Sequence, residues 1–319
     1  MTSASAPGKI ILFGEHAVVY GRPAIAVPVT HVRATAEVTD GPSSGVRLTA
    51  SDFGESYWLH DAAEDALAAA VRVVQKRAQL EELPPLTIEV HSDIPIASGL
   101  GSGAATAAAL IRALAQHLGR TDLATDEEVS SMTYEVEKIH HGTPSGIDNT
   151  VVALEQPVYF VRQQPRNLVE PIAVARPLRL LIGDTGRHSS TREVVGDVRR
   201  QWQASEARFE EIFDACGRIA AAARQAIQSG DLQELGHLML ENHRWLQKMT
   251  VSSPELDKLV EAATEAGALG AKLSGAGRGG NMIALVQDES ASAVQSALQA
   301  AGAVNVLSSF VESSGQRVA

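Results

Sequence analysis

A glycine-rich stretch at residues 95–105, with the sequence PIASGLGSGAA, holds the clearest signal for chemistry in this chain. Closely spaced glycines let successive backbone N–H groups point into one concavity, and a helix that follows adds unpaired donors and its positive dipole end. Such a loop can bind phosphate, although a glycine-rich turn before a helix is also common as a plain connection. It lacks the Lys-Ser/Thr ending of the common P-loop and the GxGxxG spacing of dinucleotide sites, so we exclude those two types of site.

Polar residues interrupt an otherwise apolar N-terminal segment, residues 6–21, with the sequence APGKIILFGEHAVVYG. Lys9, Glu15 and His16 lie close together there, and a buried strand excludes such groups unless they have partners. One interpretation is therefore that they line a cleft. The other is that Lys9 begins a strand in solvent and the other two lie in its closing turn, and composition alone favours this second interpretation.

Two carboxylates, Glu137 and Asp148, flank residues 143–146, whose sequence TPSG fits a type I turn. Such a pair can serve as Mg²⁺ ligand and proton acceptor in phosphoryl transfer. It can equally be a solvated helix end followed by an Asx turn. The histidines His140 and His141 are adjacent rather than one helical turn apart, so we do not expect a zinc site.

A second glycine cluster, KLSGAGRGGN at residues 272–281, lies between two apolar segments that read as strands. One glycine loop is weak support for a binding site. Two of them in different halves of the chain suggest that a nucleotide or substrate binds between them, at the junction of two domains.

The length of 319 residues predicts about two domains, and mixed strands and helices with antiparallel hairpins at the start predict an α+β fold. Proline residues punctuate the chain at Pro165, Pro171 and Pro177, which places the expected boundary near residue 175. We therefore expect domains at 1–175 and 176–319.

The hydrophobic periodicity predicts the individual elements. Strands are expected at 9–13, 17–20, 24–38, 46–50, 57–59, 86–91, 178–183 and 304–308 and near Ala271 and Met282, with an extended segment at 149–161. Helices are expected at 62–79, 104–118, 125–140, 193–228, 232–249, 254–266 and 289–300.

Composition narrows the class of protein. The net charge is −11 and no cluster of Lys and Arg interleaves with aromatic residues, so we do not expect nucleic-acid binding. Apolar runs are too short for a membrane span, and the N-terminus does not resemble a secretion signal. The single cysteine, Cys216, cannot form an internal disulfide and is expected to be a buried, inert thiol. A cytoplasmic protein is the expectation.

Taken together, the motifs resemble those of the GHMP kinases, a superfamily with three motifs in this order. Residues 9–21 resemble the first motif, 95–105 the second and 272–280 the third. Within the superfamily, the pieces GEHAVVYG at 14–21 and HGTPSGIDN at 141–149 are similar to the branch that phosphorylates mevalonate. The resemblance implies an N-terminal ATP-binding domain with a left-handed β-α-β crossover and a ferredoxin-like C-terminal domain, with ATP and substrate between them.

The resemblance also implies roles for single residues. Asp148 matches the base that accepts the proton of the mevalonate 5-hydroxyl, and Lys9 matches the lysine that pairs with it and stabilises the transferring phosphoryl group. Glu137 matches the magnesium ligand. Its usual partner is the second serine of a GLGSS motif, but this chain has Gly103 there, so Ser102 or a water would complete the Mg²⁺ shell. The residues expected to bind the ATP phosphates are Pro95, Ser98, Gly99, Leu100, Gly101, Ser102, Gly103 and Ala104.

Further residues are expected at the substrate. Thr191 resembles a threonine that positions the substrate hydroxyl or phosphate, with a helix N-cap as the alternative. His16 and Arg162 are candidates for the mevalonate end, because a carboxylate suits a bidentate guanidinium, although Arg162 at a strand end can also be merely solvated. Arg278 replaces a glycine common in relatives and would add a phosphate contact. The remaining expected substrate-binding residues are Glu15, Gly275 and Ala276.

The sequence thus predicts a kinase that uses ATP and Mg²⁺ to phosphorylate mevalonate, in the route to isoprenoids, as a monomer or a homodimer. Two alternatives stay open. One is another activity of the superfamily, on phosphomevalonate, the 3-hydroxyl of mevalonate or a sugar. The other is a catalytically inactive relative that binds nucleotide and regulates a partner.

Overall fold

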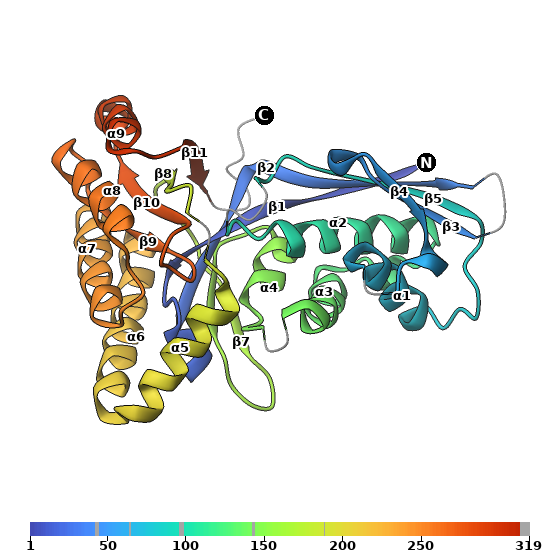
Figure 1. Cartoon of the computed structure of the whole chain (residues 1–319), viewed down its shortest axis with the longest axis horizontal. Coiled ribbons are helices and arrows are strands. Elements are labelled where there is room, and N and C mark those ends of the chain that lie inside the picture. The colour runs from blue at the N-terminus through green and yellow to red at the C-terminus, as the bar shows by residue number, and fades with distance from the viewer. Residues whose placement is uncertain (42–44, 64, 96–98, 142–143, 188, 313–319) are drawn as a thin grey trace. The chain divides into compact units, whose positions relative to one another are not determined.

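The chain forms two units in the computed structural model, which describes residues 1–41, 45–63, 65–95, 99–141, 144–187 and 189–312 but not the side chains of Phe53, His140 and His141. Unit 1 comprises residues 1–9, 29–96 and 100–155, and unit 2 comprises residues 10–28, 97–99 and 156–319. Strands β1 (Thr2–Phe13) and β2 (Ala24–Asp40) contribute residues to both (Figure 1). The domain boundary expected near residue 175 stays a prediction.

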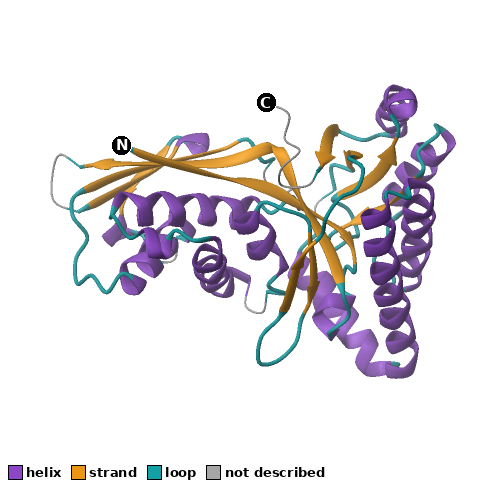
Figure 2. Ribbon diagram, turned by 180° about the vertical axis from the view of Figure 1, so that it is seen from behind, coloured by secondary structure: helices purple, strands orange, loops and turns teal. Residues whose placement is uncertain are grey.

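Unit 1 is a sheet with helices on one face (Figures 1 and 2). Its hydrogen-bonded order is β4-β3-β5-β2, and β5 is parallel to β3 but antiparallel to β2. The connection from β3 to β5 passes through β4 and a helix, as expected for a β-α-β crossover. The remaining strands are β3 (Val46–Ala50), β4 (Glu55–Trp58) and β5 (Leu86–Ser92), and the helices are α1 (Ala66–Arg77), α2 (Ser102–His117), α3 (Asp126–His141) and α4 (Ile147–Leu154).

Helix α2 is the central helix of unit 1. It contacts α1, α3, α4 and β5, and most of its residues are buried. Its many alanines allow neighbouring elements to approach closely, because a small side chain keeps the helix surface near its axis. This packing fixes the start of α2, where the first glycine-rich stretch ends.

Unit 2 contains a four-stranded antiparallel sheet in the order β11-β8-β10-β9. With a helical region between β8 and β9 and one helix between β10 and β11, this is the β-α-β-β-α-β arrangement of a ferredoxin-like domain. Its strands are β8 (Leu178–Asp184), β9 (Gly270–Ser274), β10 (Asn281–Val286) and β11 (Asn305–Val311), and its helices are α5 (Thr191–Ala204), α6 (Glu206–Ser229), α7 (Leu232–Lys248), α8 (Pro254–Glu265) and α9 (Asp288–Ala301).

A smaller antiparallel ladder also belongs to unit 2. The first residues of β2 pair with β6 (Val158–Val161), which pairs with β7 (Leu168–Pro171).

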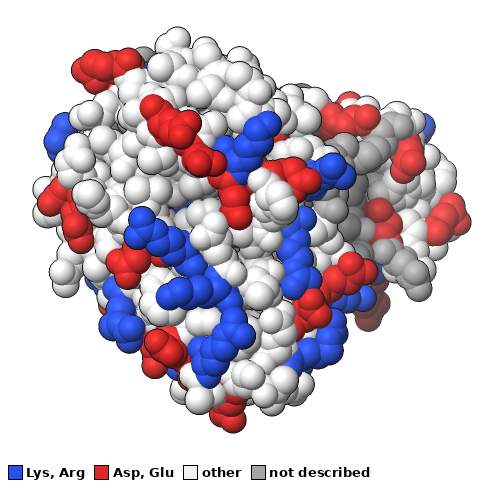
Figure 3. Space-filling model, turned by 60° about the vertical axis from the view of Figure 1, so that its left-hand side comes forward, with Lys and Arg blue, Asp and Glu red and all other residues white. Residues whose placement is uncertain are grey.

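Cys216 on α6 is fully buried, and burial raises the pKa of its thiol to about 12, as expected for an inert thiol. On the face shown in Figure 3, acidic side chains border the groups of Lys and Arg. Within the described residues, none of the helices is both long and apolar enough to cross a membrane.

The α+β prediction is confirmed, but three element predictions were wrong. Residues Ala17–Tyr20 form a 3-10 helix rather than a strand, because the left-handed backbone of His16 (φ 59°) turns the chain directly before them. Residues 147–154 are helical although Thr150 and the valines after it favour a strand. This segment packs against α2 and α3, so tertiary contacts override the local propensity.

The third error concerns the long helix predicted at 193–228. Ser205 takes a non-helical conformation (φ −150°, ψ 62°) and separates α5 from α6. Because serine tolerates such a break and the apolar periodicity continues on both sides, the sequence pattern alone shows one helix.

Candidate active site

An ion pair between Lys9 and Asp148 joins β1 to the first turn of α4 in unit 1. Lys9 Nζ is 3.1 Å from Asp148 Oδ2, and the two side chains are 6% and 30% exposed. Lys9 is on β1 and its backbone N–H donates to the carbonyl of Leu100 at 2.8 Å, while Asp148 lies in the first turn of α4. A nearly buried ammonium requires a partner, and Asp148 supplies it. The structure therefore brings together the two residues that the sequence analysis expected to act as a pair in catalysis.

Gly101 leaves the space that the Lys9 side chain occupies. Its backbone is left-handed (φ 76°), and a Cβ added there would lie 2.8 Å from Cγ and 2.9 Å from Cε of Lys9. Contacts this short do not occur, so any other residue would displace the lysine. The glycine-rich stretch thus positions Lys9 as well as providing backbone donors.

Glu137 belongs to the same charged cluster. It lies on α3 and is 9% exposed, and its Oε2 is buried without a hydrogen-bond partner in the described part of the chain. The pKa of Glu137 is raised to about 8, first by burial and then by the negative charge of Asp148, against the opposing charge of Lys9. The carboxyl therefore tends to keep its proton at neutral pH when no metal ion is bound beside it.

The start of α2 presents backbone donors beside this cluster. Gly101 is the N-cap and provides no side-chain cap, and the first N–H to bond within the helix is that of Ala105, to the carbonyl of Gly101 at 2.9 Å. The N–H groups of Ser102, Gly103 and Ala104 therefore have no partner inside the helix. An added Cβ at Gly103 would meet no atom of the described residues within 4 Å. Of the other residues expected to bind phosphate, Leu100 is buried and Ser98 lies outside the described residues. Pro95 and Gly99 are the described residues on either side of 96–98.

In unit 2, a buried ion pair joins the first and third motifs. Lys272 Nζ contacts Glu15 Oε1, and both side chains are fully buried. Burial lowers the pKa of Lys272, while the charge of Glu15 and its hydrogen bond oppose this shift. Ser274 Oγ, two residues further along, donates to the carbonyl of Ile11 at 2.7 Å. Glu15 therefore holds the first motif in place and has little surface with which to reach a ligand.

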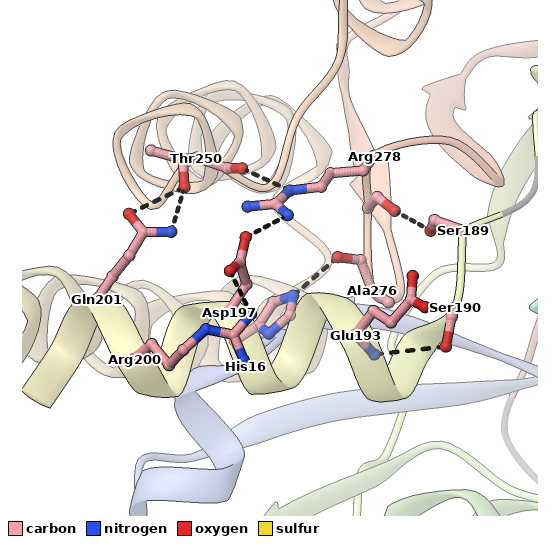
Figure 4. A network of polar contacts seen from close by, with 11 residues as sticks. His16, Ser189, Ser190, Glu193, Asp197, Arg200, Gln201, Thr250, Ala276 and Arg278 are labelled. Atoms are coloured by element: carbon pink, nitrogen blue, oxygen red, sulfur yellow. Dashed lines mark hydrogen bonds and ion pairs between the residues drawn. The ribbon is translucent and has the colours of Figure 1, made fainter.

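His16 is buried and neutral in unit 2. Its Nε2 lies 2.9 Å from the carbonyl oxygen of Ala276, which can only accept, so Nε2 carries the proton and donates (Figure 4). The pKa of His16 is lowered to about 4, first by burial and to a smaller extent by the charge of Arg278, against the opposing effect of the bond to Ala276. With the proton on Nε2, the free nitrogen Nδ1 is a hydrogen-bond acceptor.

The other expected substrate residues also lie in unit 2. Thr191 is the first residue of α5, but the N-cap is Ser190, whose Oγ accepts from Glu193 N–H at 3.4 Å. Arg162 follows β6 and is half-buried, and its side chain makes no hydrogen bond or ion pair with any described residue. Gly275 and Ala276 begin the loop between β9 and β10, in which Gly275 is left-handed (φ 89°).

Sequence reasoning missed two side chains of this unit. Lys272 appeared only as part of a glycine cluster, although a lysine inside an apolar strand is itself a signal for a buried partner. Asp197 on α5 was not considered, and it accepts from Arg278 Nη1 at 2.6 Å. No local pattern marks Asp197, because Arg278 is 81 residues away in the sequence.

Comparison with known proteins adds the family. Models of the GHMP kinases N-terminal domain and the GHMP kinases C-terminal domain match residues 65–156 and 223–304. The mevalonate kinase of Thermococcus sibiricus is 35% identical over 95% of this chain and 94% of that protein. The mevalonate kinase of Pyrococcus abyssi is 39% identical over 92% and 91%. The crystal structure of L. major mevalonate kinase in complex with R-mevalonate superimposes with a TM-score of 0.84, at 31% identity over 98% and 96%.

The raised pKa of Glu137 predicts a pH dependence of stability. Between the ordinary value of 4.5 and about 8, the folded protein keeps a proton that the unfolded chain has lost, so this group lowers the free energy of unfolding as pH rises. In metal-free buffer, Glu137→Gln removes that slope and is increasingly more stable than the parent protein from about pH 5 to about pH 8. Urea denaturation across this range measures the difference. Glu135→Gln, on the same helix, is the control. A Glu137→Gln difference that does not grow with pH contradicts the assignment.

Proposed function

This chain belongs to the GHMP kinase family, and we propose that within the family it transfers the γ-phosphoryl group of ATP to the 5-hydroxyl of (R)-mevalonate. Nearly full-length similarity to mevalonate kinases supports the substrate. The observation that carries the chemistry is the Lys9–Asp148 ion pair beside the uncapped start of α2. A cytoplasmic setting is part of the proposal, and the single free thiol of Cys216 supports it.

In the proposed reaction, Asp148 orients the acceptor hydroxyl and takes its proton. Phosphoryl transfer has a loose transition state in which charge spreads over the oxygens of the transferred group, so positioning and charge stabilisation dominate. Lys9 supplies positive charge at that point, and its burial strengthens the effect, because little water screens it. Lys9 thus contributes to the transition state directly and also holds Asp148.

The ATP phosphates are assigned to the first glycine-rich stretch and the start of α2. The N–H groups of Ser102, Gly103 and Ala104 and the positive end of the helix dipole suit an anion. The open space at Gly103 allows a phosphate to approach the backbone closely. The assigned set is Pro95, Ser98, Gly99, Leu100, Gly101, Ser102, Gly103 and Ala104.

Glu137 and Ser102 fit a magnesium ion. The buried, unpartnered Oε2 of Glu137 is an acceptor that a cation can satisfy, and a positive charge there would stabilise the ionised carboxyl. Mg²⁺ is commonly held by one or two carboxylates together with substrate phosphates and waters, so Gly103 in place of a serine leaves a position that water can fill. When bound, the ion would neutralise charge on the phosphates of ATP.

Substrate binding is assigned to a set of residues that belong to unit 2. Because Nε2 of His16 is used by Ala276, its Nδ1 can accept from a hydroxyl but cannot donate to a carboxylate. Arg162, whose guanidinium is free of described partners, then suits the mevalonate carboxylate. Thr191 in the first turn of α5 would contact a hydroxyl or phosphate. Gly275 and Ala276 complete the set, and Glu15 supports it through Lys272.

Substrate profiling tests the function. A coupled assay of ADP release is run with mevalonate, phosphomevalonate, galactose and no acceptor. Mevalonate should give a kcat/KM at least about a hundredfold above the others, because a site that hydrogen-bonds its own substrate rejects analogues strongly. A preference for phosphomevalonate or a sugar supports the alternative kinase activities. No ADP release with any acceptor supports the inactive, nucleotide-binding relative.

The role of Asp148 predicts a loss of turnover with binding retained. Asp148→Asn should lower kcat by about 10²–10⁴, because the amide cannot accept the hydroxyl proton. The KM for ATP should change by less than about threefold, since the phosphate donors of α2 are untouched. Steady-state kinetics with mevalonate in excess measure both values. Asp122→Asn, at the surface of the same unit, is the control, and near-normal turnover of Asp148→Asn refutes the role.

The magnesium assignment predicts unequal effects at its two ligands. Glu137→Gln should raise the Mg²⁺ concentration for half-maximal activity by at least about tenfold, because a charged ligand is lost. Ser102→Ala should raise it by less than about threefold, because Mg²⁺ readily keeps a water in that position. Titration of activity with MgCl₂ at fixed ATP measures both. An unchanged Mg²⁺ dependence in Glu137→Gln contradicts the assignment.

A further inference from the structure

Strained backbone gathers in one network of unit 2. Five non-glycine residues of the described chain have a left-handed φ, and three of them lie here: His16 (59°), Thr250 (67°) and Arg278 (55°) (Figure 4). Side chains make this conformation unfavourable, so it persists only where the surroundings hold it, and such residues cluster at functional sites. The strained backbone therefore marks this network as a place to look for a functional role.

Arg278 ties one loop to two other elements. It lies in the loop at residues 275–280, here called the second glycine loop. Its backbone N–H donates to the carbonyl of Val251 at 2.7 Å and its Nε donates to the carbonyl of Thr250 at 3.2 Å, both in the turn before α8. Its Nη1 donates to Oδ2 of Asp197 on α5 at 2.6 Å.

Asp197 receives two guanidinium groups. Arg278 binds one oxygen, and Arg200, three residues along α5, binds the other at 2.6 Å. The two pairs differ in exposure, since the Arg200 side chain is 70% exposed and that of Arg278 is 34% exposed. A charge pair that is partly withdrawn from water is screened less, so the bond to Arg278 is the stronger constraint. Gln201, also on α5, contacts Thr250 Oγ1 at 2.9 Å and supports the same junction.

The second glycine loop carries groups assigned to the substrate. Ala276, two residues before Arg278, accepts from His16 Nε2. The carbonyl of Gly277 accepts from Ser189 Oγ at 2.6 Å, just before the N-cap of α5. The loop lies so close to its neighbours that a Cβ at Gly277 would be 1.9 Å from the carbonyl oxygen of Val251. A small displacement of this loop would therefore move Ala276 and His16 together.

We propose that Arg278 is a positioning residue, whose ion pair with Asp197 fixes the second glycine loop to α5 and so holds the Ala276 carbonyl and His16 in place for the substrate. The role given to His16 and Ala276 rests on the proposed function. A glycine at position 278 would adopt the left-handed backbone without strain but could not form the pair. The backbone of Arg278 is thus strained, and its side chain in return fixes the second glycine loop to α5.

Three single variants and one exchanged pair test the proposal. Arg278→Gly and Asp197→Asn each break the pair, and Arg278→Gly also relieves the backbone strain, so a loss of folding is not its expected effect. Arg200→Ala is the matched control, because it removes the other guanidinium from the same carboxylate. Hydrogen–deuterium exchange of peptides that cover residues 275–280 reports on the loop. The KM for mevalonate and kcat report on the site.

Faster exchange at residues 275–280 is expected in Arg278→Gly and Asp197→Asn but not in Arg200→Ala. In the same two variants, the KM for mevalonate should rise about three- to fivefold, as expected for a partly exposed ion pair, while kcat changes less than about twofold. The exchanged pair, Arg278→Asp with Asp197→Arg, should recover part of the slow exchange and part of the KM for mevalonate, since the ion pair is restored and Asp also tolerates the left-handed backbone, while the bond from Arg278 Nε to Thr250 is lost.

Unchanged exchange in both single variants overturns the proposal, as does an equal effect of Arg200→Ala. Faster exchange with an unchanged KM shows that the pair orders the loop without positioning the site, which also overturns it. If the parent protein does not turn over mevalonate at all, the proposed function fails, whereas the exchange data still decide whether the pair fixes the loop.

Discussion

The burial of the Lys9 ammonium is the constraint on which unit 1 depends. A charge so far removed from water needs an opposite charge, and Asp148 provides it at 3.1 Å. Three other features accompany this pair. Position 101 has to be a glycine, because a side chain there would collide with Lys9. Segment 147–154 forms a helix that carries Asp148 in its first turn, and Glu137 on α3, whose pKa is raised first by burial, lies beside both charges.

Unit 2 repeats the same physical principle with different residues. The Glu15–Lys272 pair is fully buried, and it fixes the first motif to the strand that leads into the second glycine loop. Around it, His16 and Arg278 each give up a favourable backbone conformation and make contacts that bind the loop from two sides. In each unit an ion pair, Lys9–Asp148 or Glu15–Lys272, holds a motif in place. Such pairs keep the geometry of the neighbouring functional residues fixed before a ligand binds.

How far the sequence predicts this protein depends on the range of the interaction. The α+β class and most elements follow from local periodicity. The family resemblance predicted that Lys9 pairs with Asp148, and the structure contains that ion pair, while the catalytic roles of the two residues stay predictions. Composition alone favoured Lys9 in solvent, and its burial shows that interpretation was wrong. Segments 17–20 and 147–154 were misjudged because their neighbours in space decide their conformation. The pairing of Asp197 with Arg278 has no local signal at all.

The central claim is that Lys9 and Asp148 act as one unit, and a double-mutant cycle tests it most directly. The rate of ADP release with saturating ATP and mevalonate is measured for Lys9→Ala, Asp148→Asn and the double variant. Residues that act together lose most of their effect at the first substitution, so the second should lower the rate by less than about tenfold. A double variant whose loss of rate equals the product of the two single losses would contradict the account.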